Sequence, residues 1–246
     1  VIAQDITRYG MDWDGKPHLA DLLEELCKLD FHWIRLHYLY PEWIDDRLID
    51  VIAHEDKILK YLDIPLQHCN DKILKKMNRR GDKKYLCALL DKLRERIPGL
   101  VLRTSIIAGL PGEGEEEFDE LCDFLREQKL LRAGVFPYSP EEGTRAAKME
   151  RVDSDEAARR AERIVDIQSE IIDAWNDERQ GDVMEVLCEG FDGQSMLFVG
   201  RSYAESPDID GRIYFSAPRD VAAGEFVPVR ITGAMDGELT GELAEE

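Results

Sequence analysis

Residues 61–81, YLDIPLQHCNDKILKKMNRRG, pass from an apolar run to a polar group and then to a basic helical stretch. Asp63, Gln67 and His68 stand where the apolar run gives way. In parallel α/β sheets the loops at the carboxyl ends of the strands face one mouth, and ligand sites lie there. The stretch therefore predicts a strand, a helix and a group of candidate site residues between them.

Other apolar runs, rich in branched or aromatic residues, repeat this arrangement along the first part of the chain. They lie at residues 1–4, 33–39, 101–109 and 133–139. Between the runs, apolar residues recur at helical spacing, as in residues 19–26, 44–51, 86–97 and 118–125. The alternation of strand and helix predicts βα units, and therefore an α/β fold with a parallel sheet.

The sequence changes in character after residue 152. Residues 153–179 carry one apolar stripe, with Asp153 or Ser154 as the expected N-cap, and predict a long amphipathic helix. From Gly181 onward, short alternating runs separated by Gly, Asp and Pro indicate a small antiparallel β-barrel. We therefore expect an α/β domain at 1–152, a connecting helix at 153–180 and a β-barrel at 181–246.

Composition restricts the partners and the compartment. The chain has 52 acidic residues against 32 Lys and Arg, a formal net charge of -20. This excess disfavours binding to a phosphate backbone; it suits a basic partner, or serves only solubility. The five cysteines share no close spacing, so we expect reduced thiols and no local metal site. With no long apolar run and no leader visible, a cytoplasmic protein without a membrane segment is expected.

Charged residues inside the predicted strands form part of the candidate site. Arg35, Asp63 and Arg103 all fall within apolar runs. A buried charge is costly unless it is paired. The three residues therefore either contact a ligand or form a structural ion-pair network, and the sequence leaves both interpretations open.

The segment AGLPGEG, residues 108–114, connects the fourth run to the next helix. Gly109 and Gly112 would allow close approach of the backbone to a ligand at the start of that helix, but a turn with a helix cap has the same sequence. The adjacent His68 and Cys69 do not make a metal site, because nothing nearby supplies further ligands at a suitable spacing.

Six ordered blocks resemble those of the radical S-adenosylmethionine (SAM) methylthiotransferases. They are AQDITRYG, WIRLHYLYP, YLDIPLQH, ILKKMNRRG, LRTSIIAGLPGE and VFPYSPEEGT. The resemblance covers nearly the whole chain and implies a partial TIM-like (βα) barrel of the radical SAM type, followed by an OB-like TRAM barrel. It also implies SAM as a cofactor, two [4Fe-4S] clusters in the full-length protein and an electron-donor protein for the reductive cleavage of SAM.

The resemblance assigns SAM-binding roles to residues at the strand ends. It places Gln4 and Asp5 near the methionine part, with Arg35 or Arg103 for the carboxylate. It places Asp63 and Gln67 toward the ribose or the carboxylate, Gly109 and Gly112 beside the nucleoside, and Phe136 and Tyr138 near the adenine. The expected cofactor-binding set is thus Gln4, Asp5, Arg35, Asp63, Gln67, Arg103, Gly109, Gly112, Phe136 and Tyr138.

The sequence departs from the family in one chemically important respect. The 246 residues contain no CxxxCxxC loop, which holds the radical cluster in the family, and they do not include the family's sulfur-donor domain. We therefore expect no metal ligands in this chain, an N-terminal portion outside it, and no catalysis by the chain alone.

Two branches of the family differ in substrate: one modifies a tRNA adenosine, and one modifies the β-carbon of an aspartate in small-subunit ribosomal protein S-twelve. Residues 182–246 contain 14 acids against four Arg and no Lys, about -10 in charge. This charge would repel RNA and attract a basic ribosomal protein, which favours the second branch. The remaining alternative is an acidic binding module without catalysis that grips a basic partner.

Overall fold

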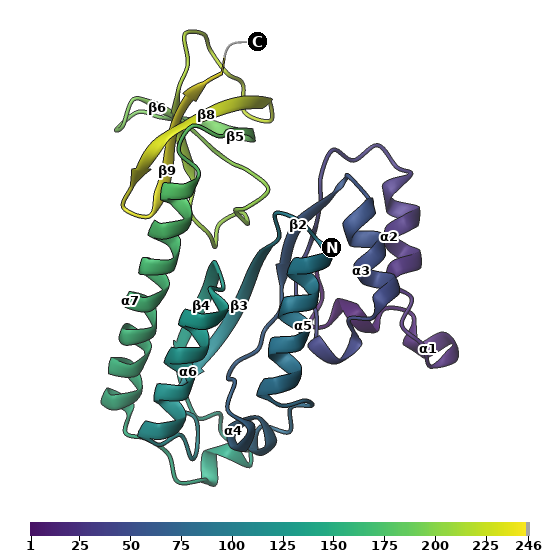
Figure 1. Ribbon diagram of the computed structural model, residues 1–246, viewed down its shortest axis with the longest axis vertical. Coiled ribbons are helices and arrows are strands. Elements are labelled where there is room, and N and C mark those ends of the chain that lie inside the picture. Colours follow the sequence, from purple (N-terminus) through teal and green to yellow (C-terminus); the bar gives the residue numbers. More distant parts are fainter. Residues whose placement is uncertain (245–246) are drawn as a thin grey trace. The chain divides into compact units, whose positions relative to one another are not determined.

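The computed structural model describes residues 1–244 and divides into two compact units (Figure 1). The first unit is Val1–Gln168, and the second begins at Ser169. The division falls within the long helix α7 (Ser154–Glu178), which contributes residues to both units. The domain limits expected at 152 and 180 stay a prediction, since they treat this helix as a separate connector.

The first unit is built on a four-stranded parallel sheet. Its strands are β1 (Ile34–Leu36), β2 (Ile58–Asp63), β3 (Val101–Ala108) and β4 (Arg132–Pro137), in the spatial order β1-β2-β3-β4. The order follows the chain, as expected for successive right-handed βα units. The register places Asp63 opposite Arg103, and Arg103 opposite Arg132. Neighbouring strands thus place their charged residues side by side.

The helices of this unit are amphipathic, as the leucine spacing predicts. They are α1 (Met11–Asp14), α2 (Leu19–Cys27), α3 (Asp46–His54), α4 (Asp71–Lys76), α5 (Lys83–Arg96) and α6 (Glu115–Gln128), with 3-10 turns η1 (Ile6–Arg8), η2 (Pro41–Trp43) and η3 (Ala146–Lys148). Asp45, Asn70 and Asp82 cap α3, α4 and α5, each accepting backbone N–H groups of the first turn.

The sheet has one buried apolar face and one polar face. On β3, Leu102 and Ile106 are buried, whereas Arg103, Ser105 and Ile107, which occupy the alternate positions, are half-buried. Since side chains alternate along a strand, the apolar set meets the helices and the polar set points to the other side. This second face carries the candidate site.

The expected first strand at residues 1–4 is wrong. The Val1 ammonium group donates to Arg35 O in β1 at 2.7 Å, and His37 N–H donates to Val1 O at 3.2 Å, but no strand forms. The extended run stops because Asp5 caps the turn η1: its carboxylate accepts the Thr7 N–H at 3.0 Å. The cap bends the chain before a ladder can develop.

The second unit contains a closed five-stranded barrel. Its strands are β5 (Val183–Asp192), β6 (Leu197–Arg201), β7 (Ile213–Ser216), β8 (Phe226–Met235) and β9 (Glu238–Leu243), in the order β5-β6-β7-β9-β8. Alternate residues fill its core, among them Val186, Phe215 and Val229, each fully buried.

The barrel is not antiparallel throughout. β7 pairs with β9 in parallel, while the other four pairings are antiparallel. The chain crosses from β7 to β8, which pairs with β5, and the tight turn at Asp236 and Gly237, both with positive φ, returns β9 next to β7. Turn signals alone predict hairpins, and they do not show such a crossing.

Among the described residues, no helix is both long enough and apolar enough to cross a membrane.

Candidate functional site

Charged and aromatic side chains cluster on the polar face of the sheet. Asp63 is fully buried, and Arg103 Nη1 donates to its Oδ1 at 3.0 Å. The guanidinium carbon of Arg35 lies 4.3 Å from the centre of the Tyr61 ring. His37 Nδ1 lies 3.5 Å from the second oxygen of Asp63. Arg35, Asp63 and Arg103, expected to meet a ligand or one another, are thus gathered on one surface across β1, β2 and β3.

Asp63 retains hydrogen-bonding capacity in this cluster. Its Oδ2 is buried and accepts no hydrogen bond from the part of the chain that the structure describes. A buried acceptor left open costs free energy unless a partner completes it. The ion pair with Arg103 therefore accounts for one carboxylate oxygen, and the second, 3.5 Å from His37 Nδ1, keeps the capacity to accept a hydrogen bond.

Gln67 continues the edge of the sheet beyond β2. Its backbone has φ of +68°, uncommon for a residue other than glycine, and forms an isolated parallel bridge with Ile106. Gln67 N–H donates to Ser105 O at 2.7 Å, and Ile107 N–H donates to Gln67 O at 3.0 Å. The strained conformation is thus held by hydrogen bonds from β3, which fix the backbone at the carboxyl end of the sheet.

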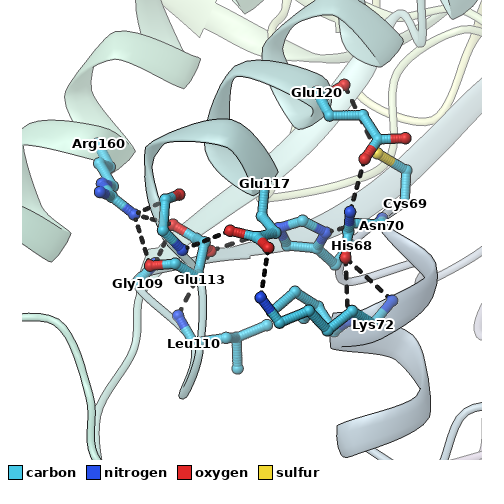
Figure 2. A network of polar contacts seen from close by, with 12 residues as sticks. His68, Cys69, Asn70, Lys72, Gly109, Leu110, Glu113, Glu117, Glu120 and Arg160 are labelled. Atoms are coloured by element: carbon cyan, nitrogen blue, oxygen red, sulfur yellow. Dashed lines mark hydrogen bonds and ion pairs between the residues drawn. The ribbon is translucent and has the colours of Figure 1, made fainter.

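His68 connects the end of β2 with the loop after β3. The imidazole is fully buried, and its Nδ1 accepts the Asn70 N–H at 3.0 Å. In the neutral ring the hydrogen therefore lies on Nε2, which is 3.4 Å from Glu113 Oε2. His68 is a structural partner of Glu113, as Figure 2 shows.

Glu113 is the centre of a buried polar network in the loop at 109–114 (Figure 2). Its Oε1 accepts the Gly109 N–H at 2.9 Å and the Arg160 Nη1 at 2.8 Å. Arg160 is only 7% exposed and also donates to Glu113 O at 3.1 Å and to Glu156 at 3.0 Å. One carboxylate thus ties the loop to α7 and to the end of β2.

The charge of Glu113 is maintained by these partners. Burial alone would raise the pKa of its carboxyl group, but hydrogen bonds from His68, Arg160 and the Gly109 N–H lower the pKa overall. The carboxylate is therefore held ionised in a buried position.

Gly109 and Gly112, two of the loop's three glycines, have close neighbours within the protein. A β-carbon on Gly109, whose φ is +81°, would lie 2.5 Å from the β-carbon of Ala157 in α7. One on Gly112, whose φ is +84°, would collide with the Lys76 ammonium group. Backbone conformation and close packing therefore explain both glycines, and their expected contact with a nucleoside stays a proposal.

The remaining expected residues lie at the same edge of the sheet. Gln4 is exposed, and Asp5 caps η1, beside the end of β1. Phe136 is 54% exposed at the end of β4, and the Tyr138 hydroxyl is buried without a hydrogen bond among the described residues. Because β1 and β4 are about 14 Å apart at ordinary strand spacing, Gln4 and Tyr138 flank the central charged cluster.

Sequence reasoning missed several residues of these two clusters. The alternation rule could have found two of them, because His37 follows Arg35 by two residues and Tyr61 precedes Asp63 by two. Glu113 gave no signal of its own in the segment before the next helix, and its partner Arg160 lies 47 residues further along the chain.

The polar face fits SAM in its chemical groups. An ammonium group suits Asp63 Oδ2, a carboxylate suits Arg35 and Arg103, and an adenine suits the exposed ring of Phe136. Gly134 aids the fit: its missing β-carbon would lie 3.3 Å from Arg103 and 3.2 Å from Phe136, so a side chain there would crowd both.

An iron-sulfur cluster does not fit the residues present. No three His, Cys, Asp or Glu side chains among residues 1–244 are grouped to hold a metal ion. Burial raises the pKa of the thiol groups of Cys69, Cys122 and Cys188, so they are poor thiolate ligands.

Comparison with known proteins agrees with this architecture. Residues 8–125 match the radical SAM superfamily, and residues 181–244 match the TRAM domain. The solved structure of coproporphyrinogen III oxidase (HemN) from Escherichia coli, a radical SAM enzyme, superposes with a TM-score of 0.52 at 21% identity, covering 64% of this chain and 39% of that chain. That likeness concerns the fold alone.

The first unit is thus a radical SAM domain, and the barrel is a TRAM domain. Among curated proteins, the ribosomal protein uS12 methylthiotransferases RimO of Symbiobacterium thermophilum and Myxococcus xanthus are 47% and 46% identical over all of this chain. That of Pelotomaculum thermopropionicum is 48% identical over 98% of it. The chain belongs to the radical SAM methylthiotransferase family, and it spans about half the length of these relatives, 51% to 55%.

Proposed function

We propose that this chain forms the SAM-binding and substrate-docking part of a methylthiotransferase that modifies the β-carbon of an aspartate in ribosomal protein uS12. The observation that carries the proposal is the similarity to RimO proteins along the whole chain, 47% for one of them. The polar face of the sheet supports it, because its donor and acceptor set suits a zwitterionic nucleoside.

Bound SAM would supply a hydrogen-abstracting radical by reductive cleavage, which needs a [4Fe-4S] cluster and an electron-donor protein from outside this chain. The residues of this chain would bind and orient the molecule. Asp63 would accept from the ammonium group, and Arg103 or Arg35 would hold the carboxylate. Gln67 would reach the ribose beside the loop at 109–114, while Phe136 would cover one face of the adenine.

The charge of the TRAM domain favours a protein substrate. Residues 182–246 carry about -10. A field of this sign steers a basic ribosomal protein toward the enzyme and repels tRNA. A ribosomal substrate also places the proposed reaction in the cytoplasm.

Mass spectrometry tests the proposal directly. The protein, extended upstream of Val1 and reconstituted with iron and sulfide, is incubated with SAM, a reductant and purified uS12. The expected result is replacement of one aspartate hydrogen by a methylthio group. If only tRNA is modified, the protein is instead a tRNA methylthiotransferase and the proposal is wrong.

The acidic binding module is the second candidate, supported by the charge of about -10 on residues 182–246. Iron and sulfide analysis of the extended protein separates the two. A protein that binds uS12 but never incorporates a cluster would support the module.

A further inference from the structure

The first unit carries a local excess of positive charge that opposes the net charge of the chain. Between residues 72 and 84 there are seven Lys or Arg and a single acid, whereas the whole chain is at -20. We define the α4–α5 basic patch as Lys75, Lys76, Arg79, Arg80, Lys83 and Lys84. Such a cluster produces its own positive potential close to the surface, since distant acids are screened at physiological salt.

Much of this charge is not neutralised within the protein. Lys83 pairs with Glu120 at 3.2 Å, and the neighbouring Lys72 pairs with Glu117 at 2.6 Å. By contrast Lys75, Lys76 and Lys84 form no ion pair with any residue that the structure describes, and all three are exposed. Solubility alone does not account for a cationic cluster in an acidic protein, because excess acid already provides it.

Aromatic rings lie among these cations. The guanidinium of Arg79 lies 4.9 Å from the centre of the Tyr40 ring, and that of Arg80 lies 5.8 Å from the Trp43 ring. Tyr85 is 38% exposed and donates its hydroxyl to Pro41 O at 2.8 Å. These contacts join η2, the turn at 77–82 and the start of α5 into one surface.

The patch lies at the functional edge of the sheet. η2 follows β1, α4 follows β2, and the loop at 109–114 follows β3, so all three lie at the carboxyl ends of the strands. A hollow of about 550 Å³ beside the loop is lined by three cations, Lys72, Lys76 and Arg151, and by three acids, Glu113, Glu117 and Glu150. When a substrate enters at this edge, a molecule bound to that substrate would therefore contact the basic patch.

From this surface we infer that the α4–α5 basic patch binds the phosphate backbone of single-stranded RNA next to the protein substrate. Cations bind phosphates, and an exposed aromatic ring such as that of Tyr85, 38% exposed, can stack with an unpaired base, so the combination suits RNA better than an acidic protein. The inference rests on the proposed function: a ribosomal protein in its assembled state lies against RNA. The cationic patch would suit the RNA of such a target, and the acidic TRAM domain would suit its basic protein.

Fluorescence anisotropy with a labelled oligouridylate tests the patch on the 246-residue chain. The patch variant is Lys75→Gln, Arg80→Gln and Lys84→Gln. The control variant is Lys16→Gln, Lys28→Gln and Arg126→Gln, which removes the same charge from exposed positions elsewhere. At 0.1 M KCl we expect the patch variant to bind on the order of tenfold more weakly, with a log–log salt slope smaller by about 2. The control should bind like the parent chain.

The outcomes separate the alternatives. Equal RNA affinity of the two variants would overturn the inference, as would competition by polyglutamate equal to that by RNA, which would assign the patch to an acidic protein. If the triple variant is less folded by circular dichroism, Lys75→Gln alone serves, with an expected slope change of about 0.7. The assay needs neither SAM nor turnover, so its failure leaves the methylthiotransferase proposal standing, and failed modification of uS12 leaves the RNA result intact.

Discussion

At the scale of single residues, the buried carboxylate of Glu113 connects three separate parts of the first unit. It joins Gly109, His68 and Arg160, and it is ionised in a position that water barely reaches. Removing one partner of a buried pair leaves the other charge uncompensated. Arg160 keeps Glu156 as a second partner, which moderates the loss.

We expect Glu113→Gln to lower the free energy of unfolding by about 3 kcal/mol. Chemical denaturation followed by circular dichroism measures it. The matched control is Glu115→Gln: Glu115 contacts the same arginine at 3.3 Å but is 68% exposed, so its loss should cost about 0.5 kcal/mol or less. Equal effects of the two substitutions would show that burial of Glu113 does not matter.

The same carboxylate predicts a pH dependence. Because the pKa of Glu113 is lowered in the folded state, its contribution to stability is present above its ordinary value of 4.5 and is lost as the pH falls through the lowered pKa. His68 and Arg160 face this carboxylate and pair with it, and Glu115 and Glu156 pair with Arg160 beside it. Denaturation midpoints between pH 6 and pH 3, on the order of the range where carboxylates titrate, should fall less steeply for Glu113→Gln than for the parent chain. Parallel profiles would contradict the assignment.

How far the sequence predicts the site depends on the distance between partners along the chain. Asp63, Arg35 and Arg103 were identifiable because each interrupts an apolar run, and the structure gathers them. The Glu113–Arg160 pair was not, because 47 residues separate its members and no local rule connects them.

At the scale of elements, the loop after β3 packs closely against α7. We expect Gly109→Ala to destabilise the protein by about 2 kcal/mol more than Gly143→Ala. Both glycines have φ above +80°, so both substitutions incur the backbone strain, but only Gly109 would place its new methyl group 2.5 Å from Ala157. Thermal unfolding of the two variants measures the difference. Equal losses of stability in the two variants would mean that α7 can move away from the new methyl group at no cost in free energy.

Regular elements were more predictable than their ends and pairings. The runs at 101–109 and 133–139 became β3 and β4, since βα alternation is a local property of the sequence. Residues 1–4 failed to form a strand because Asp5 caps a turn there. The parallel pairing of β7 with β9 depends on a crossing that turn residues do not encode.

At the scale of the molecule, the proposed function assigns docking of uS12 to the acidic TRAM domain. The TRAM domain is acidic, so we expect Asp208→Asn, Asp220→Asn and Asp236→Asn together to slow association with uS12 about tenfold at low salt. All three are exposed, and asparagine tolerates the positive φ of Asp208 and Asp236. Stopped-flow association rates at two salt concentrations measure the effect.

The control for this prediction removes the same charge from the first unit: Asp30→Asn, Asp91→Asn and Asp123→Asn, all exposed. If steering depends on the TRAM domain, this variant should associate at nearly the parental rate. Equal slowing by both variants would show that total charge alone governs the encounter.

The two sheets also differ in whether they have outer strands, and this difference affects how the protein behaves at high concentration. The barrel closes on itself, whereas β4 is an outer strand of the open sheet and carries an aromatic ring, Phe136, that is 54% exposed. Outer strands offer backbone groups to any other strand that approaches, and stacking of such strands begins aggregation. Concentrated stocks should therefore turn turbid through pairing at β4, and a lysine placed there should keep them clear.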